Sequence, residues 1–109
     1  MAQLQFDQSR NGSTASAQVG DLIEVRLPEN PTAGYRWQLG PLDSGATVEL
    51  ASDEFDVASP AVGSGGHRRL NFRAVRAGAC TIHLHYRRSW EQQAIDSFAI
   101  TIDVAARPK

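Results

Sequence analysis

The segment Cys80-Thr81-Ile82-His83-Leu84-His85-Tyr86 alternates apolar and polar residues, and this alternation decides the fold class. The same period of two recurs at residues 98–104, 23–27 and 70–74. Successive side chains of a strand point to opposite faces, so each segment is predicted to be a strand with one buried face and one wet face. No segment has the 3.6-residue period of a long amphipathic helix. An all-β protein is therefore expected.

Turn signals made of Gly, Pro, Asn and Ser separate the alternating segments along the chain. They place strands near residues 2–7, 13–19, 21–28, 35–40, 46–50, 53–58, 67–76, 79–88 and 94–104. Sheets that are wet on one side are typically antiparallel. This number of short strands in 109 residues favours an immunoglobulin-like antiparallel β-sandwich over a barrel. We expect one domain over residues 1–109, with a frayed tail at residues 105–109.

The charge balance is close to neutral, with 11 Lys and Arg against 12 Asp and Glu. This gives no global electrostatic reason to bind nucleic acid or an anionic membrane, and neither partner is expected. A local basic face supports a less favoured interpretation, in which the chain binds an acidic partner or nucleic acid. Its members would be Arg68, Arg69, Arg73, Arg76, Arg87 and Arg88.

No apolar stretch approaches the roughly 20 residues that span a bilayer. The start, residues 1–5, lacks the charged and apolar regions of a signal peptide. The expected compartment is therefore periplasmic or extracellular if a signal peptide was removed, and cytoplasmic otherwise.

The single cysteine, Cys80, excludes an intrachain disulfide and a cysteine-rich zinc site. It lies in the apolar register of its strand, so a buried thiol is favoured over a nucleophile. His83 and His85 share a strand face, and His67 on a neighbouring strand would complete a metal site, although an exposed polar face is the favoured interpretation. We expect no metal and no cofactor. The chain has no Gly-x-Ser-x-Gly elbow, paired-carboxylate constellation or P-loop ending, so it is not expected to be an enzyme.

Three segments between strands have the character of presented loops. Asn30-Pro31-Thr32-Ala33-Gly34 is a stiffened turn, because proline restricts two residues and glycine can take a positive φ. Gly63-Ser64-Gly65-Gly66 lets another backbone approach closely, and Arg88-Ser89-Trp90 combines a cation with an aromatic side chain. Alternate connections of a sandwich lie at the same end, and the three loops are expected to be such connections, so all three should meet at one end of the sandwich.

Structural interpretations of these loops remain open. The first loop could be a plain sandwich corner, and the second a flexible connector. Trp90 could be tucked under its own loop. Tyr35 and Trp37 fall on the same side of the strand after the first loop, where both are predicted to pack in the core and support that loop.

The three motifs together resemble the chagasin family, immunoglobulin-like inhibitors of papain-like cysteine peptidases, and the resemblance covers nearly the whole chain. The family's Asn-Pro-Thr-Thr-Gly-Tyr is matched by residues 30–35, with Ala33 at the second threonine, and Trp37 follows. Its Gly-x-Gly-Gly is matched by residues 63–66. Its Arg-Pro-Trp becomes residues 88–90, with Ser89 replacing the proline.

The resemblance implies that the first loop enters the peptidase cleft, with Thr32 nearest the catalytic cysteine and histidine. Gly65 and Gly66 would run along one side of the cleft, and Trp90, supported by Arg88, would pack on the other. The implied peptidase-binding residues are Asn30, Pro31, Thr32, Ala33, Gly34, Gly63, Ser64, Gly65, Gly66, Arg88, Ser89 and Trp90.

The predicted function is reversible, tight-binding inhibition of a papain-like cysteine peptidase by a monomer. Three loops, at residues 30–35, 60–66 and 88–93, would occlude the active-site cleft. The alternative is a noncatalytic immunoglobulin-like adhesion or ligand-binding module.

Overall fold

The computed structural model describes residues 2–30, 34–42, 46–57 and 65–106. Within these ranges the chain forms strands and one short 3₁₀ helix. In order they are β1 (Gln3–Phe6), η1 (Gln8–Arg10), β2 (Ser13–Gln18), β3 (Leu22–Glu29), β4 (Tyr35–Leu39), β5 (Val48–Val57), β6 (Gly66–Ala74), β7 (Gly78–Arg88) and β8 (Asp96–Ala105).

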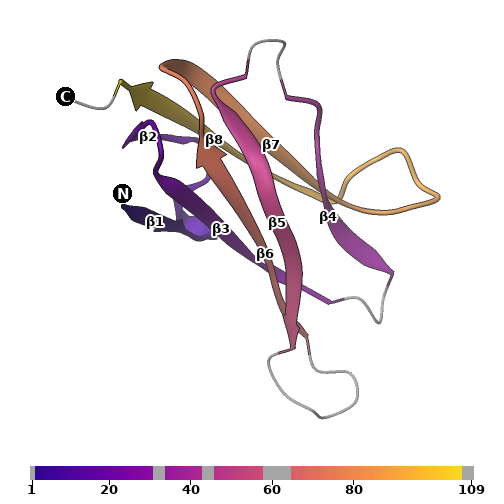
Figure 1. The fold of residues 1–109 in the computed structure, drawn as a ribbon. Coiled ribbons are helices and arrows are strands. Elements are labelled where there is room, and N and C mark those ends of the chain that lie inside the picture. The colour runs from indigo at the N-terminus through magenta and orange to yellow at the C-terminus, as the bar shows by residue number, and fades with distance from the viewer. Residues whose placement is uncertain (1, 31–33, 43–45, 58–64, 107–109) are drawn as a thin grey trace.

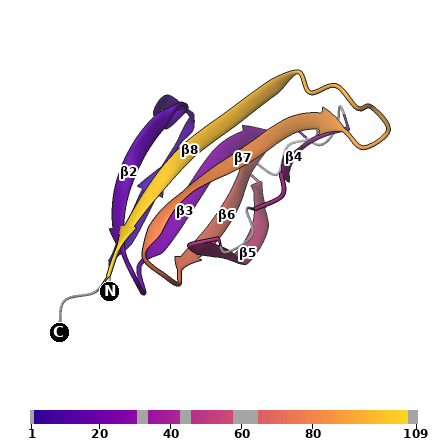
Figure 2. The ribbon, with the colours of Figure 1, turned by 90° about the horizontal axis from the view of Figure 1, so that it is seen from above.

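The strands form two sheets that face each other, as Figures 1 and 2 show. We call the sheet with strand order β1-β3-β6-β5 sheet A, and the sheet with order β2-β8-β7-β4 sheet B. The apolar side chains of the alternating segments fill the space between them. Phe72 of sheet A and Phe98 of sheet B are almost fully buried there. The all-β sandwich predicted from the period of two is confirmed.

Among the described strands, the prediction of antiparallel sheets is correct for four of the six pairings and wrong for the other two. β1 runs parallel to β3, and β2 runs parallel to β8. The reason is that β1 and β2, although consecutive in the sequence, belong to different sheets. The chain crosses between the sheets at η1, where the Asp7 carboxylate accepts a hydrogen bond of 2.9 Å from the Ser9 N–H. A crossover of this kind replaces the hairpin that would have made the pairing antiparallel.

The two strands predicted at residues 46–50 and 53–58 correspond to one strand, β5 (Val48–Val57), and residue 58 lies outside the described ranges. Its pairing with β6 shifts register between Leu50 and Ser52, as at a β-bulge. A bulge inserts one residue and breaks the alternation locally, so it imitates a turn in the sequence.

The predicted tail begins too early, because Ala105 still pairs with Gln18 at the end of β8. Its carbonyl also accepts a hydrogen bond from the Val19 N–H. Residues 107–109 lie outside the described part. No helix in the described ranges has the length and apolarity to cross a membrane.

The thiol of Cys80 is buried in the core, as its register predicts. His67 lies on β6 of sheet A, whereas His83 and His85 lie on β7 of sheet B, so the placement of His67 on a strand neighbouring the other two is wrong. Among the described residues, no three His, Cys, Asp or Glu side chains lie close enough together to hold a metal ion.

Candidate functional site

The three motifs occupy the connections β3–β4, β5–β6 and β7–β8 (Figure 1). The structure describes Asn30, Gly34, Gly65 and Gly66, as well as residues 88–90. The remaining predicted site residues lie outside the described ranges; they are Pro31, Thr32, Ala33, Gly63 and Ser64. The described residues at the ends of the loops, where each loop joins its strands, show how the loops lie relative to one another.

The incoming side of the first loop lies against the outgoing side of the second. Gly66, the first residue of β6, is the register partner of Glu29, the last residue of β3. A methyl group on Gly65 would lie 3.3 Å from the Glu29 carbonyl oxygen. The glycine thus lets the end of the second loop lie in close contact with the start of the first.

The outgoing side of the first loop lies against the third. Gly34 has a φ of 84°, and a methyl group on it would lie 3.0 Å from Cη2 of Trp90. The first loop is therefore bordered on one side by the second and on the other by the third. This confirms, for the described residues, the expected meeting of the loops at one end of the sandwich.

Gly34→Ala is expected to lower the free energy of unfolding by about 1–2 kcal/mol, because an L residue is strained at positive φ. It should also displace Trp90 and weaken the peptidase inhibition predicted from the sequence several-fold. Gly12→Ala is the matched control, because Gly12 has a φ of 79° but nothing within 4 Å of the added methyl. Thermal unfolding and inhibition assays should show a stability loss in both variants and weaker inhibition only in Gly34→Ala. Equal weakening in both would contradict a role for the Gly34–Trp90 contact.

The third loop is organised around the Arg88 guanidinium. Its Cζ lies 4.6 Å from the ring centroid of Tyr35 and 5.8 Å from that of Trp90, both within cation–π range. Glu91 adds an ion pair of 3.4 Å to Nη1 of Arg88, and the Glu91 N–H donates to the Arg88 carbonyl. Trp90 is 71% exposed, so the alternative of an aromatic tucked under its own loop is wrong.

Tyr35 and Trp37 differ in their burial. Trp37 is 2% exposed and stacks on Tyr86, with the ring centroids 4.9 Å apart. Tyr35 is only half-buried, because its ring lies at the edge of the sandwich beneath Arg88. The core position predicted for both is confirmed for Trp37 and is wrong for Tyr35.

Two residues beside the first loop were missed as site residues. Glu29 has a side chain only 1% exposed, and Tyr86 accepts a hydrogen bond of 2.9 Å from the Asn30 N–H. A signal existed for both. Extending the period of two from residues 23–27 puts Glu29 on the buried face, where a carboxylate requires a partner. Tyr86 continues the buried register of residues 80–84 in the same way.

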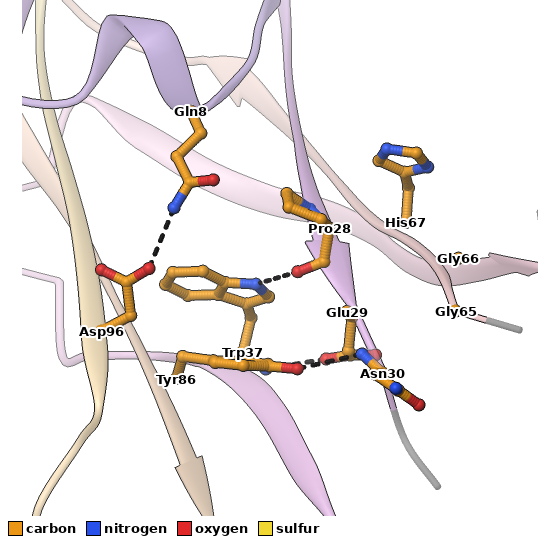
Figure 3. A pocket seen from close by; sticks show the side chains of 10 residues that line it. All are labelled: Gln8, Pro28, Glu29, Asn30, Trp37, Gly65, Gly66, His67, Tyr86 and Asp96. Carbon is orange, nitrogen blue, oxygen red and sulfur yellow. Dashed lines mark hydrogen bonds between the residues drawn. The ribbon is translucent and has the colours of Figure 1, made fainter. Parts of the chain in front are cut away.

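A groove of about 490 Å³ opens beside these residues (Figure 3). Glu29, Asn30 and Gly65 line it from the side of the first two loops. Tyr86 and Asp96 line it from sheet B, and Asp96 accepts a hydrogen bond of 2.9 Å from the Gln8 side chain. The groove thus lies between the sheets at the end that carries the loops.

The predicted basic face is largely neutralised at its two central arginines. Arg68 forms ion pairs with Asp53 and Glu29, and Arg69 forms them with Glu24, Glu54 and Asp56. The hydrogen bond to Asp53, with the attraction of Glu29, raises the pKa of Arg68 above its usual range. A hydrogen bond to Glu54 does the same for the pKa of Arg69. Paired arginines leave little net positive potential for an acidic partner.

Comparison with known proteins gives a consistent family. A family model described as "Chagasin family peptidase inhibitor I42" matches residues 16–102. Chagasin of Trypanosoma cruzi is 33% identical over 104 residues, which cover 90% of this chain and 93% of that protein. Amoebiasin-1 of Entamoeba histolytica is 29% identical over 103 residues, which cover 93% of this chain and 99% of that protein.

Among solved structures, the cysteine protease inhibitor EhICP2 of Entamoeba histolytica superposes with a TM-score of 0.85 at 25% identity. The superposition covers 95% of this chain and 96% of that one.

Proposed function

The chain belongs to the chagasin family of peptidase inhibitors, and we propose that it inhibits papain-like cysteine peptidases by filling their active-site cleft with its three loops. Inhibition of cysteine peptidases follows from membership in the family and from the similarity to a cysteine protease inhibitor over nearly the whole chain. The proposal concerns the class of target and the surface that binds it.

The observation that supports this surface is the contact of the first loop's two sides with the other two loops. Gly65 lies beside Glu29, and Gly34 lies beside Trp90. A central loop with a neighbour on each side suits a cleft with two walls. Three such loops could supply an interface of the standard size, about 1,600 Å² in total.

We propose that the central loop contributes Asn30, Pro31, Thr32, Ala33 and Gly34, with Thr32 nearest the catalytic cysteine of the peptidase. The second loop contributes Gly63, Ser64, Gly65 and Gly66 to one wall of the cleft. The third contributes Trp90, with Arg88 holding it in place through the contacts described above.

The inhibition is noncovalent, and this chain contributes no catalysis of its own. A mixed disulfide with the catalytic cysteine of the peptidase would require an accessible thiol on the inhibitor. Cys80 is the only cysteine in the sequence and is 3% exposed. The buried thiol therefore argues against a mixed disulfide, in agreement with reversible occlusion of the cleft.

The test is steady-state hydrolysis of a small fluorogenic substrate by papain while the protein is titrated in. We expect a saturable loss of activity that is recovered on dilution and that competes with a small active-site ligand. Unchanged turnover at micromolar concentrations of the folded protein would contradict the proposal and favour an adhesion or ligand-binding module.

A further inference from the structure

β4 follows the first loop and lies at the edge of sheet B, with β7 as its neighbour on one side. Edge strands leave alternate N–H groups without a strand partner. The Trp37 N–H is instead bound by a side chain of the opposite sheet, since it donates a 2.7 Å hydrogen bond to Oε1 of Glu29. A carboxylate at the end of β3, immediately before the loop, therefore binds the backbone of the strand that follows the loop.

The second oxygen of this carboxylate faces Arg68, with Oε2 3.3 Å from Nη1. Asp53 binds the same guanidinium from β5. Arg68 is therefore held between two carboxylates and fixes the orientation of the one that binds Trp37. Burying charged groups in this way costs free energy, and a well-packed apolar pair is often at least as stabilising. The ion pairs of Arg68 with Glu29 and Asp53 are thus better explained by the orientation that they give the Glu29 carboxylate than by a gain in stability.

Two more hydrogen bonds cross between the sheets at the same place (Figure 3). The indole Nε1 of Trp37 donates to the Pro28 carbonyl at 2.8 Å. The Asn30 N–H donates to the Tyr86 hydroxyl at 2.9 Å. The residue that begins the loop and the strand that follows it are thereby both tied to the opposite sheet.

We propose that Glu29, oriented by Arg68 and assisted by Tyr86, is a positioning residue that keeps the first loop in its binding conformation. The inference rests on the proposed function, because it names the groups that hold the first loop in the conformation in which it would bind the peptidase. Glu29 acts through the loop and need not touch the peptidase. When only a fraction of molecules holds the competent conformation, the apparent dissociation constant rises by the inverse of that fraction.

The experiment measures association and dissociation rates with papain, together with thermal unfolding, for Glu29→Ala and Glu29→Gln. Glu29→Ala removes the hydrogen bonds of the Glu29 carboxylate to the Trp37 N–H and to Arg68. At a temperature where the variant is fully folded, association should slow about tenfold, as expected if about a tenth of the molecules keep the binding conformation. Glu29→Gln keeps an acceptor for the Trp37 N–H and should recover much of the loss. Glu54→Ala is the control, because it breaks an ion pair with Arg69 at a side chain that is 56% exposed. It should leave association unchanged.

A double-mutant cycle tests whether Arg68 acts through Glu29. Arg68→Met alone should slow association several-fold, and it should add little in the Glu29→Gln background. Amide hydrogen exchange at Asn30 and Trp37 should accelerate in Glu29→Ala more than exchange in the core of β6.

Tyr86→Phe is the second variant, for the case that Glu29→Ala does not fold. It removes the hydroxyl that accepts from the Asn30 N–H and keeps the ring. It should still slow association about threefold, because a smaller fraction of molecules would hold the binding conformation.

The inference and the proposed function can fail separately. If the unmodified protein does not inhibit papain, the proposed function fails. If it inhibits, and Glu29→Ala has a lower melting temperature but an unchanged association rate when folded, then Glu29 is merely structural and the inference is overturned. Additive effects in the double-mutant cycle would also contradict the role given to Arg68.

Discussion

Thr32→Glu is expected to raise the inhibition constant for papain by at least about 100-fold without a measurable change in melting temperature. The proposal places Thr32 at the deepest point of the cleft, where a carboxylate would be desolvated without a partner. Such burial costs several kcal/mol, and about 3 kcal/mol already exceeds a factor of 100 in a binding constant. Papain inhibition assays and thermal unfolding on the same samples measure both effects.

Thr14→Glu is the matched control for this substitution. Thr14 is an exposed residue of the edge strand β2, paired with Thr101 of β8. The same charge introduced there should leave the inhibition constant within about twofold, since surface substitutions usually change little. If Thr32→Glu inhibits as well as the unmodified protein, the central loop does not enter the cleft.

Trp90→Ala is expected to weaken inhibition about 30-fold, chiefly through faster dissociation. An exposed tryptophan that becomes buried in an interface is a typical hot spot, and its truncation costs about 2 kcal/mol or more. Changes at one interface act mostly on the dissociation rate. Because Trp90 is 71% exposed in the free protein, its loss should hardly alter the free energy of unfolding.

Ile95→Ala serves as the control for Trp90→Ala. Ile95 lies in the same β7–β8 connection and is 61% exposed, but it belongs to none of the three motifs. Stopped-flow association and competitive dissociation should show a change of less than about threefold for Ile95→Ala, the range expected of an interface neighbour that is not a hot spot. An unchanged dissociation rate for Trp90→Ala would mean that the third loop does not contact the peptidase.

The mixed pairing of the sheets could not be predicted from the sequence, because alternation reports burial and not strand direction. The residues of β1 and β2 carry the same signal whether they join a hairpin or cross between the sheets. Their parallel partners were decided by the crossover at η1. The bulge in β5 led to a wrong prediction of two strands for a related reason, since an inserted residue interrupts the alternation as a turn would.

The sequence by itself determined the two-layer all-β architecture, the buried registers, the three loop motifs and the family to which the chain belongs. These are local properties, set by the period of two and by the residues that a turn requires. The tertiary structure decided which groups hold the loops in place. Glu29 and Trp37 lie on opposite sheets, and Tyr86 is 56 residues from Asn30 in the sequence. Hydrogen bonds of this kind depend on how the sheets pack face to face, which no local pattern encodes.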